Sequence, residues 1–412
     1  MRVLLINKFL YPKGGDAIST LATGRLLSKK GHEVYFWGMD HPHNPDYPQK
    51  EYFVSYVDYN KPQRTLDQLK AAINILYSFE AKNKFETIIN KIQPDIVHLN
   101  NFAHQISPSI LHVLRKNKIP AVMTMRDYKM VCASYSMLVN GKPCEKCKDG
   151  KYYHCFLQRC TKGSAFKSAV NTLEMYLHHK ILHIYDGINI YISPSNFLKS
   201  KVEEMGFKHE VVYLPNFVDI DTFHPSYESQ EESIVYIGRL SHEKGIETLM
   251  EAVKGIDVKL KIIGDGPLTE SLLNKSKNDK IRNIEFMGYK KGEDLQNEIK
   301  KSIFMIIPSE CYENNPRTVI EAFALGKPVV GARIGGIPEL VRDGETGITF
   351  EAWNVNDLRD KIQLMLQNRG RLQEMGKKAR EFVEKEMNPE THYEKLIKIY
   401  DKSANKMMQK KS

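Results

Sequence analysis

The sequence has no long run of apolar residues, and this excludes one broad class of protein. No stretch of its 412 residues approaches the roughly 18 consecutive apolar residues that a membrane-spanning helix requires. The segment from Met1 to Asn7 is too short for a signal peptide and predicts a buried first strand. Hydrophobic content of 42% and charged content of 27% are ordinary for a globular chain. We therefore expect a cytoplasmic protein, with two domains because this length exceeds one compact core.

The sequence also lacks the helix-turn-helix, RNA-binding and zinc-finger patterns of proteins that bind nucleic acid. Its net charge of +10 is unevenly placed, because residues 1–215 hold 29 Lys and Arg against 18 Asp and Glu. Residues 216–412 hold 31 against 32. A basic first half favours an acidic partner such as an anionic membrane surface or a lipid-linked diphosphate. A solvated basic surface is the alternative, and we expect no nucleic acid as a partner.

Cysteine is scarce, but five of the six cysteines crowd into residues 132–160. A Cys-x-x-Cys pair followed by two more cysteines, in a loop rich in Lys, Gly and Tyr, predicts a structural zinc site. Two disulfides would also satisfy the spacing, although a reducing cytosol argues against them. Cys311 stands apart, and we expect it to be a buried filler. The expected zinc ligands are Cys144, Cys147, Cys155 and Cys160.

Strands and helices alternate through both halves of the chain, which predicts an α/β protein with two parallel, doubly wound sheets. Helices are expected to begin near Ala17 and near Arg317. The expected domains are 1–215, with a cysteine-rich insert at about 132–160, then 216–390, and a C-terminal helix and tail at 391–412 that cross back to the first domain. Expected strands cover 2–7, 33–37, 95–99, 120–124 and 188–192, then 233–238, 259–263, 283–287 and 303–307.

Glycine-bearing loops follow several of these strands and should line a cleft between the two domains. Gly14 and Gly15 precede a helix, where backbone N–H groups can point at an anion. The loop 238–245 carries two cations, Arg239 and Lys244, which are suited to neutralising a diphosphate. Similar glycine turns occur at 264–267, which includes Gly266, and at 335–339. Each turn alone is also explained by tight chain reversal.

Two carboxylates lie on either side of a helix start after the strand at 303–307. Glu313 lies in the polar loop, and Glu321 lies eight residues later, about one turn into the helix that begins near Arg317. A helix N-terminus at this edge of a parallel sheet is where α/β proteins bind phosphorylated ligands. One carboxylate is suited to a sugar's hydroxyls and the other to a ribose. A loop glutamate and a helix-surface glutamate are the plain alternative.

These elements in this order resemble the retaining, GT-B-fold glycosyltransferases of family 4. The resemblance covers nearly the whole chain, and its specificity is greatest between residues 303 and 350. The motifs that carry it are Gly14-Gly15, Gly238-Arg239 with Glu243-Lys244-Gly245, Gly264-Asp265-Gly266-Pro267, Glu313-x7-Glu321 with Gly326-Lys327-Pro328-Val329-Val330, Gly335-Gly336-Ile337-Pro338-Glu339, and Asp343-Gly344-x-Thr346-Gly347.

The resemblance implies a nucleotide-sugar donor and a glycan or lipid-linked acceptor in the synthesis of a cell-surface polysaccharide. It implies that Glu313 binds hydroxyls of the transferred sugar and that Glu321 takes the ribose. Arg239 and Lys244 would hold the diphosphate without a catalytic metal. A double displacement with Glu313 as nucleophile is a lesser alternative. Further donor-binding candidates are Gly15, Gly266, Asn314 and Asn315.

One position departs from the family. The chain reads Thr124-Met125-Arg126-Asp127 where many members have Thr-x-His-Asp. Arg126 has no acceptor atom and stays charged, so it cannot reproduce the role of a histidine. Three interpretations follow: Arg126 contacts the donor, or the enzyme is slow, or the chain is a binding protein without catalysis. We favour an active enzyme, with Arg126 and Asp127 as catalytic candidates beside Glu313. His98 is either another group facing the cleft or a structural histidine at a strand end.

The segment from Ser164 to Tyr185 predicts a helix with one apolar side. Packing of that side on the sheet is the expected outcome. Docking on a membrane is the alternative, because basic residues surround the segment and an acceptor could be linked to lipid. The apolar side consists of Phe166, Val170, Leu173, Tyr176, Leu177, Ile181 and Ile184.

Overall fold

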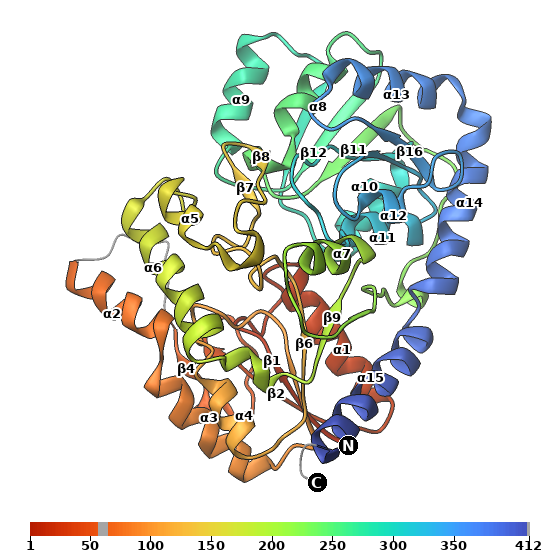
Figure 1. Ribbon diagram of the computed structural model, residues 1–412. Coiled ribbons are helices and arrows are strands. Elements are labelled where there is room, and N and C mark those ends of the chain that lie inside the picture. The colour runs from red at the N-terminus through yellow and green to blue at the C-terminus, as the bar shows by residue number, and fades with distance from the viewer. Residues whose placement is uncertain (57–64, 410–412) are drawn as a thin grey trace.

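The computed structural model describes residues 1–56 and 65–409, and the last three residues of the expected C-terminal tail lie outside this range (Figure 1). It contains two six-stranded sheets with helices packed on both faces of each. All pairings within these two sheets are parallel. The expected architecture of two Rossmann-like domains is therefore confirmed.

The first sheet has the strand order β10-β9-β6-β5-β1-β2. Its strands are short runs of apolar and β-branched residues, as buried parallel strands require. The predicted strands are confirmed to within two residues at their ends, and β10 was not predicted. The bounds are β1 Arg2–Ile6, β2 Glu33–Trp37, β5 Ile96–Leu99, β6 Ala121–Thr124, β9 Ile190–Ser193 and β10 Val211–Tyr213.

Helices cover both faces of the first sheet. One face packs on α1 and α15 through residues such as Leu27, Leu396 and Tyr400. The other face packs on α3, α4 and α7. The helices of this half, with α15, are α1 Gly15–Lys29, α2 Thr65–Leu76, α3 Phe79–Ile92, α4 Ile110–Lys116, α5 Tyr153–Leu157, α6 Ala165–Tyr176, α7 Asn196–Glu204 and α15 Pro389–Gln409.

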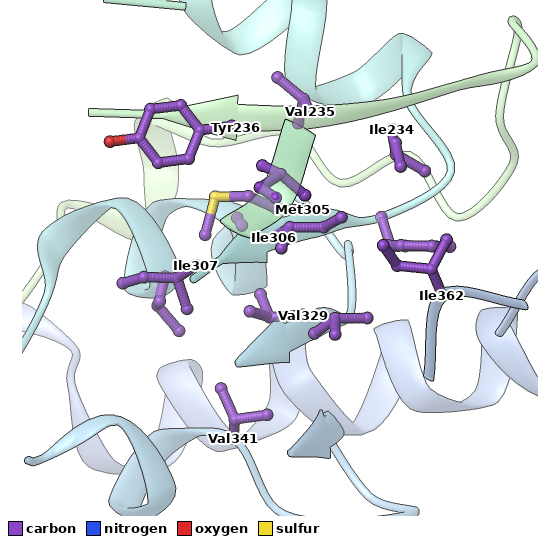
Figure 2. Close-up of a cluster of buried hydrophobic side chains, with 14 of the residues drawn as sticks. Ile234, Val235, Tyr236, Met305, Ile306, Ile307, Val329, Val341 and Ile362 are labelled. Carbon is purple, nitrogen blue, oxygen red and sulfur yellow. The ribbon is translucent and has the colours of Figure 1, made fainter. Parts of the chain in front are cut away.

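The second sheet has the strand order β13-β12-β11-β14-β15-β16 and one large apolar core. Figure 2 shows part of this core, in which residues of β11, β14 and β15 pack against Val341 and Ile362. The strands are β11 Ser233–Ile237, β12 Lys259–Ile263, β13 Ile284–Gly288, β14 Met305–Ile307, β15 Val329–Ala332 and β16 Gly347–Phe350. The helices are α8 Ile246–Val253, α9 Thr269–Asn278, α10 Gly292–Lys301, α11 Arg317–Ala324, α12 Ile337–Leu340, α13 Val355–Gln367 and α14 Arg369–Glu386.

The C-terminal helix α15 crosses back to the first sheet, as expected (Figure 1). It is held there by apolar contacts with β1 and by His98 Nδ1, which lies 2.8 Å from the hydroxyl of Tyr400. The other ring nitrogen of His98 lies 2.7 Å from Thr124 Oγ1. His98 is therefore a buried structural histidine and does not line the cleft described below.

The cysteine-rich insert adds small elements to the first half. It contains the antiparallel hairpin of β7 (Leu138–Val139) and β8 (Lys142–Pro143), a 3-10 turn at Lys148–Gly150, and α5. A second small pair, β3 (Met39–Asp40) with β4 (Val54–Ser55), extends the region after β2. None of the helices in the described ranges is long and apolar enough to cross a membrane.

Candidate active site

A cleft of about 1370 Å³ lies between the two sheets. Loops that follow the carboxyl ends of β1 and β6 line it on one side, and loops that follow β11, β12 and β14 line it on the other. This is the edge of a parallel α/β sheet at which ligands bind. Of the expected catalytic and donor-binding residues, those that line the cleft are Gly15, Arg126, Asp127, Arg239, Lys244, Glu313, Asn314, Asn315 and Glu321.

The N-terminus of α1 faces the cleft. Gly14 is the N-cap in an extended conformation, and the helix starts at Gly15. The first backbone N–H groups of a helix have no partner within it, so this end carries a partial positive charge. A side chain at Gly15 would meet Arg317 of α11 at 3.7 Å, so the two halves of the chain come close together here.

Glu313 and Lys244 form an ion pair on the side of the cleft that belongs to the second half. Lys244 Nζ donates to Glu313 Oε1 at 2.5 Å, and Ser309 Oγ donates to the same oxygen at 2.7 Å. Burial acts to raise the pKa of Glu313, but the charge and hydrogen bond of Lys244 outweigh it and lower that pKa. Glu313 is therefore a carboxylate at neutral pH, with its second oxygen available to a ligand.

Two glycines of the 264–267 turn differ in their position relative to the cleft: Gly264 lines it and Gly266 does not. Gly264 has a φ of 141°, and a side chain there would overlap the carbonyl oxygen of Gly238. Arg239, which follows Gly238, is exposed at the cleft. Gly266 lies against the backbone of Leu240 and is not among the residues that line the cleft. Its glycine is explained by that close approach.

Glu321 lies in the second turn of α11 and pairs with Arg317 on the same helix. Arg317 Nη2 lies 3.4 Å from Glu321 Oε1, and Arg317 Nη1 donates to the carbonyl oxygen of Phe217 at 3.1 Å. Burial raises the pKa of Glu321, and Arg317 opposes that rise. Arg317 was not predicted as a site residue, although its position four residues before Glu321 on one helix face is a signal that could have found it.

Arg126 is half-buried and belongs to a hydrogen-bond network that joins the two halves. Its Nε and Nη2 donate to Asn100 Oδ1 at 3.2 and 2.9 Å, and its Nη1 donates to Asn216 Oδ1 at 2.8 Å. Burial lowers the pKa of Arg126 to about 10, which leaves the guanidinium charged at neutral pH. Three of its five donors are therefore engaged by Asn100 and Asn216.

Asn314 and Asn315 continue this network from the second half. Asn314 Nδ2 donates to the carbonyl oxygen of Arg126 at 3.0 Å. Asn315 Oδ1 accepts from the backbone N–H of Asn216 at 2.9 Å, and its carbonyl oxygen accepts from Asn216 Nδ2 at 3.0 Å. The two asparagines therefore hold the loop of Glu313 against the first half. No motif in the sequence marked Asn100 or Asn216 as a site residue.

Asp127 lies beside Arg126 at the cleft. Its Oδ1 accepts from the backbone N–H of Lys129 at 2.9 Å. Burial raises the pKa of Asp127, although this hydrogen bond and the charges of Lys8 and Lys129 oppose the rise. Lys8, whose pKa is lowered by burial, was not predicted. A carboxyl group with a raised pKa at a cleft is suited to exchanging a proton with a bound hydroxyl.

The cysteines of the insert lie near one another, and zinc binding by Cys144, Cys147, Cys155 and Cys160 stays a prediction. Among the described residues, no three Cys, His, Asp or Glu side chains are arranged to hold a metal ion, so the geometry does not support zinc. All six cysteines are free thiols, and a hydrogen bond with Cys160 lowers the pKa of Cys155. Cys160 lines the cleft, so the insert contributes to it. Cys311 lines the cleft as well.

Both halves of the chain match models of glycosyltransferase families. Residues 13–222 match the family model described as Glycosyltransferase Family 4, and residues 219–382 match the model described as Glycosyl transferases group 1. One similar protein is the uncharacterized 42.6 kDa protein in the cps region of Klebsiella pneumoniae, which is 26% identical over 83% of this chain and 88% of that protein.

Solved structures share the fold across almost the whole chain. The sucrose-phosphate synthase of Thermosynechococcus elongatus has a TM-score of 0.73 at 20% identity and covers 97% of this chain and 98% of its own. HepE of Anabaena, solved in complex with UDP-glucose, has a TM-score of 0.67 at 15% identity and covers 97% of this chain and 99% of its own. At these identities the likeness shows the fold.

Proposed function

The chain belongs to glycosyltransferase family 4, and we propose that it moves a hexosyl group from a nucleotide-diphosphate sugar to a glycan or lipid-linked acceptor with retention of anomeric configuration. The observation that carries this proposal is the Lys244–Glu313 pair facing the N-terminus of α1 across one cleft. The cps-region relative and the UDP-glucose complex of HepE support a polysaccharide product and a UDP-sugar donor.

In this proposal, charged groups of the protein stabilise the leaving diphosphate, with no catalytic metal. Lys244 has three N–H donors, of which one meets Glu313, so others can reach phosphate oxygens. Arg239 adds a second cation at the cleft, and the N-terminus of α1 adds a partial positive charge. These groups act where negative charge develops as the bond to the sugar breaks. Turnover is therefore expected to persist in excess chelator.

Glu313 binds hydroxyls of the transferred sugar, and Glu321 binds the ribose. Retention follows if a phosphate oxygen of the leaving group accepts the proton of the incoming hydroxyl on the face it departs from. Asp127, with its raised pKa, lies on the acceptor side of the cleft and orients that hydroxyl. Catalysis then consists of positioning and of charge stabilisation.

The test is a panel of nucleotide sugars, screened by thermal shift and then by release of nucleoside diphosphate. We expect stabilisation by one donor class, with release reduced at least about 100-fold in Glu313→Gln because the sugar contact and the Lys244 pair are weakened. Glu310→Gln is the matched control, because Glu310 lies in the same loop, bonds to Thr248 and is not part of the cleft lining. Equal release by both variants would contradict the role of Glu313.

A binding protein without catalysis is the second candidate, and Arg126 is the observation that favours it. The guanidinium stands where many relatives have histidine and is engaged by Asn100 and Asn216. Stabilisation by a donor with no nucleotide release under any acceptor would establish this second function. Release that begins only in Arg126→His would establish it as well.

A further inference from the structure

Helix α6 is packed with its polar side inward. Ser168, Asn171 and Glu174 are buried, and so is His178 in the π-helical turn Leu177–Ile181 that continues α6. These positions follow the helical period, so they form one side of the helix. The expected packing of the apolar side is therefore wrong for Phe166, Leu173 and Ile181, which are exposed. Val170, Tyr176 and Leu177 are half-buried, and Ile184 is buried.

The buried polar side is held by specific partners. Lys129 Nζ donates to Glu174 Oε2 at 2.6 Å, with His104 Nε2 lying 3.2 Å from the same oxygen. Asn171 Nδ2 donates to the carbonyl oxygen of Ala133 at 3.2 Å. Buried polar groups need such partners, and here they fix which side of α6 faces inward.

Part of the apolar side is consequently exposed, and α5 extends this exposed part. Phe166 and Leu173 of α6 are 51% and 54% exposed, and Ile181 is 67% exposed. In the neighbouring helix α5, Leu157 is 66% exposed and Phe156 is 46% exposed. Figure 1 shows α5 and α6 close together at one edge of the first half. We call this area the α5–α6 surface; Tyr153 also belongs to it.

The exposed charged residues between residues 150 and 182 are all basic, whereas Glu145, Asp149 and Asp186, which flank this segment, are exposed and acidic. Between residues 150 and 182 the one acidic residue is Glu174, which is buried against Lys129. The basic residues of that segment are exposed, and they are Lys151, Arg159, Lys162, Lys167 and Lys180. Aromatic and aliphatic side chains bordered by Lys and Arg are the composition of helices that lie in the interface of an anionic bilayer.

We propose that the α5–α6 surface docks the protein on a lipid bilayer that contains anionic headgroups. Apolar surface that is open to water gains free energy when it is buried, and a bilayer interface provides that burial without a partner protein. Basic side chains near an anionic leaflet add electrostatic attraction. Lipid accounts for both the apolar and the basic features of the surface.

The α5–α6 surface lies next to the cleft, so docking would place the cleft near the membrane. The loop that joins α5 to α6 contributes Cys160, Thr161 and Lys162 to the cleft lining. A chain docked through α5 and α6 therefore holds one wall of its cleft at the headgroup layer. This placement suits an acceptor linked to lipid and rests on the proposed function, whereas the docking itself does not.

The test is sedimentation of the full chain with vesicles of phosphatidylglycerol and phosphatidylcholine, compared with vesicles of phosphatidylcholine alone, in the absence of donor and acceptor. We expect binding to the anionic vesicles that weakens as salt rises. The variant Phe156→Ser/Leu157→Ser/Ile181→Ser is expected to lower the partition coefficient by about tenfold or more, since it removes three exposed apolar side chains. The variant Lys167→Glu/Lys180→Glu is expected to abolish the preference for anionic vesicles.

Matched controls separate this surface from exposure or charge elsewhere. Leu364→Ser/Met408→Ser removes exposed apolar side chains of α13 and α15, and Lys277→Glu/Lys280→Glu reverses exposed charges of the second half. Both are expected to bind vesicles like the unaltered chain. Loss of binding in the controls, or no binding by the unaltered chain, would overturn the proposal, as would a dimer that only the α5–α6 variants dissociate. Nucleotide release from soluble donor is measured in parallel, so failure of docking is distinguishable from failure of the transferase.

Discussion

At the residue scale, the unusual feature is a half-buried arginine that connects three segments of the chain. Arg126 follows β6, Asn100 follows β5, and Asn216 lies between the two halves. A histidine in this place would reach fewer of these acceptors, because its ring offers two nitrogens where the guanidinium offers five N–H donors. Arg126 therefore positions the Asn216 segment, which in turn holds Asn315.

The substitution Arg126→Lys tests this role. Lysine keeps the charge but cannot form the forked contact with Asn100 and Asn216, so we expect the free energy of unfolding to fall by about 2 kcal/mol. Urea denaturation measures this change. Arg115→Lys, at an exposed residue of α4, is the control and should change stability little. An unaltered unfolding midpoint in Arg126→Lys would show that the network does not hold the two halves together.

At the element scale, α6 depends on one buried ion pair. Burial acts to raise the pKa of Glu174, but Lys129 and the neighbouring histidines outweigh it and lower that pKa far below its usual value of 4.5. Glu174→Gln leaves Lys129 buried without its counter-charge, and we expect a loss of about 3–5 kcal/mol in the free energy of unfolding at pH 7.

The size of this effect depends on pH. A carboxyl group whose pKa is lowered by folding contributes stability that is present above about pH 4.5 and is lost as pH falls further. The difference between Glu174→Gln and the unaltered chain should therefore shrink as denaturation is measured at successively lower pH below 4.5. A difference that stays constant there would contradict the ion pair as its source.

Helix α15 depends on buried neutral histidines. Burial lowers the pKa of His98 and of His392 from 6.5 to about 3, and these rings contact Tyr400 and the carbonyl oxygen of Pro215. The unfolded chain takes up these protons below pH 6.5, so stability falls with pH from there. At pH 5 each histidine costs about 2 kcal/mol.

The check is the difference in the free energy of unfolding between pH 7 and pH 5. His98→Gln should reduce this difference by about 2 kcal/mol, because the residue that gains the proton is gone. His224→Gln removes an exposed histidine and should leave the difference unaltered. An equal pH dependence in all three proteins would show that His98 is not the group responsible.

The elements also show what the sequence could predict. Strands were found because short apolar runs bounded by polar loops are a local signal, as in β12, whose bounds were predicted without error. The sequence could not show which side of α6 faces the protein, because that depends on contacts of Glu174 with Lys129 and His104, which are distant from it in the sequence. Periodicity identifies the two sides of a helix and not which side the rest of the fold covers.

The same limit applies to the candidate site. Glu313, Glu321 and Lys244 were predicted from motifs, and all three line the cleft. Gly266 belongs to such a motif but packs against Leu240 outside the cleft lining. A glycine pattern reports a close approach of backbone and does not say whether the neighbour is a ligand or the protein itself.

At the scale of the whole molecule, the two halves meet around the cleft through polar contacts. Glu339 of α12 accepts from the backbone N–H of Asn196 at 2.9 Å, at the start of α7 in the first half. Tyr312 donates to Glu145 of the cysteine-rich insert at 3.0 Å. Polar interdomain contacts of this kind break and re-form at low cost, which suits a cleft that must admit a donor and an acceptor.

The central claim is that this cleft transfers a hexosyl group with retention, and a proton NMR time course tests it most directly. The donor found in the panel is followed with its acceptor, or with water alone as slow acceptor, by the chain and by Glu313→Gln. We predict loss of the donor, release of nucleoside diphosphate and a first product with the same anomeric configuration as the donor, all strongly slowed in Glu313→Gln. A first product of the opposite configuration, or a donor that binds and is never consumed, would contradict the account.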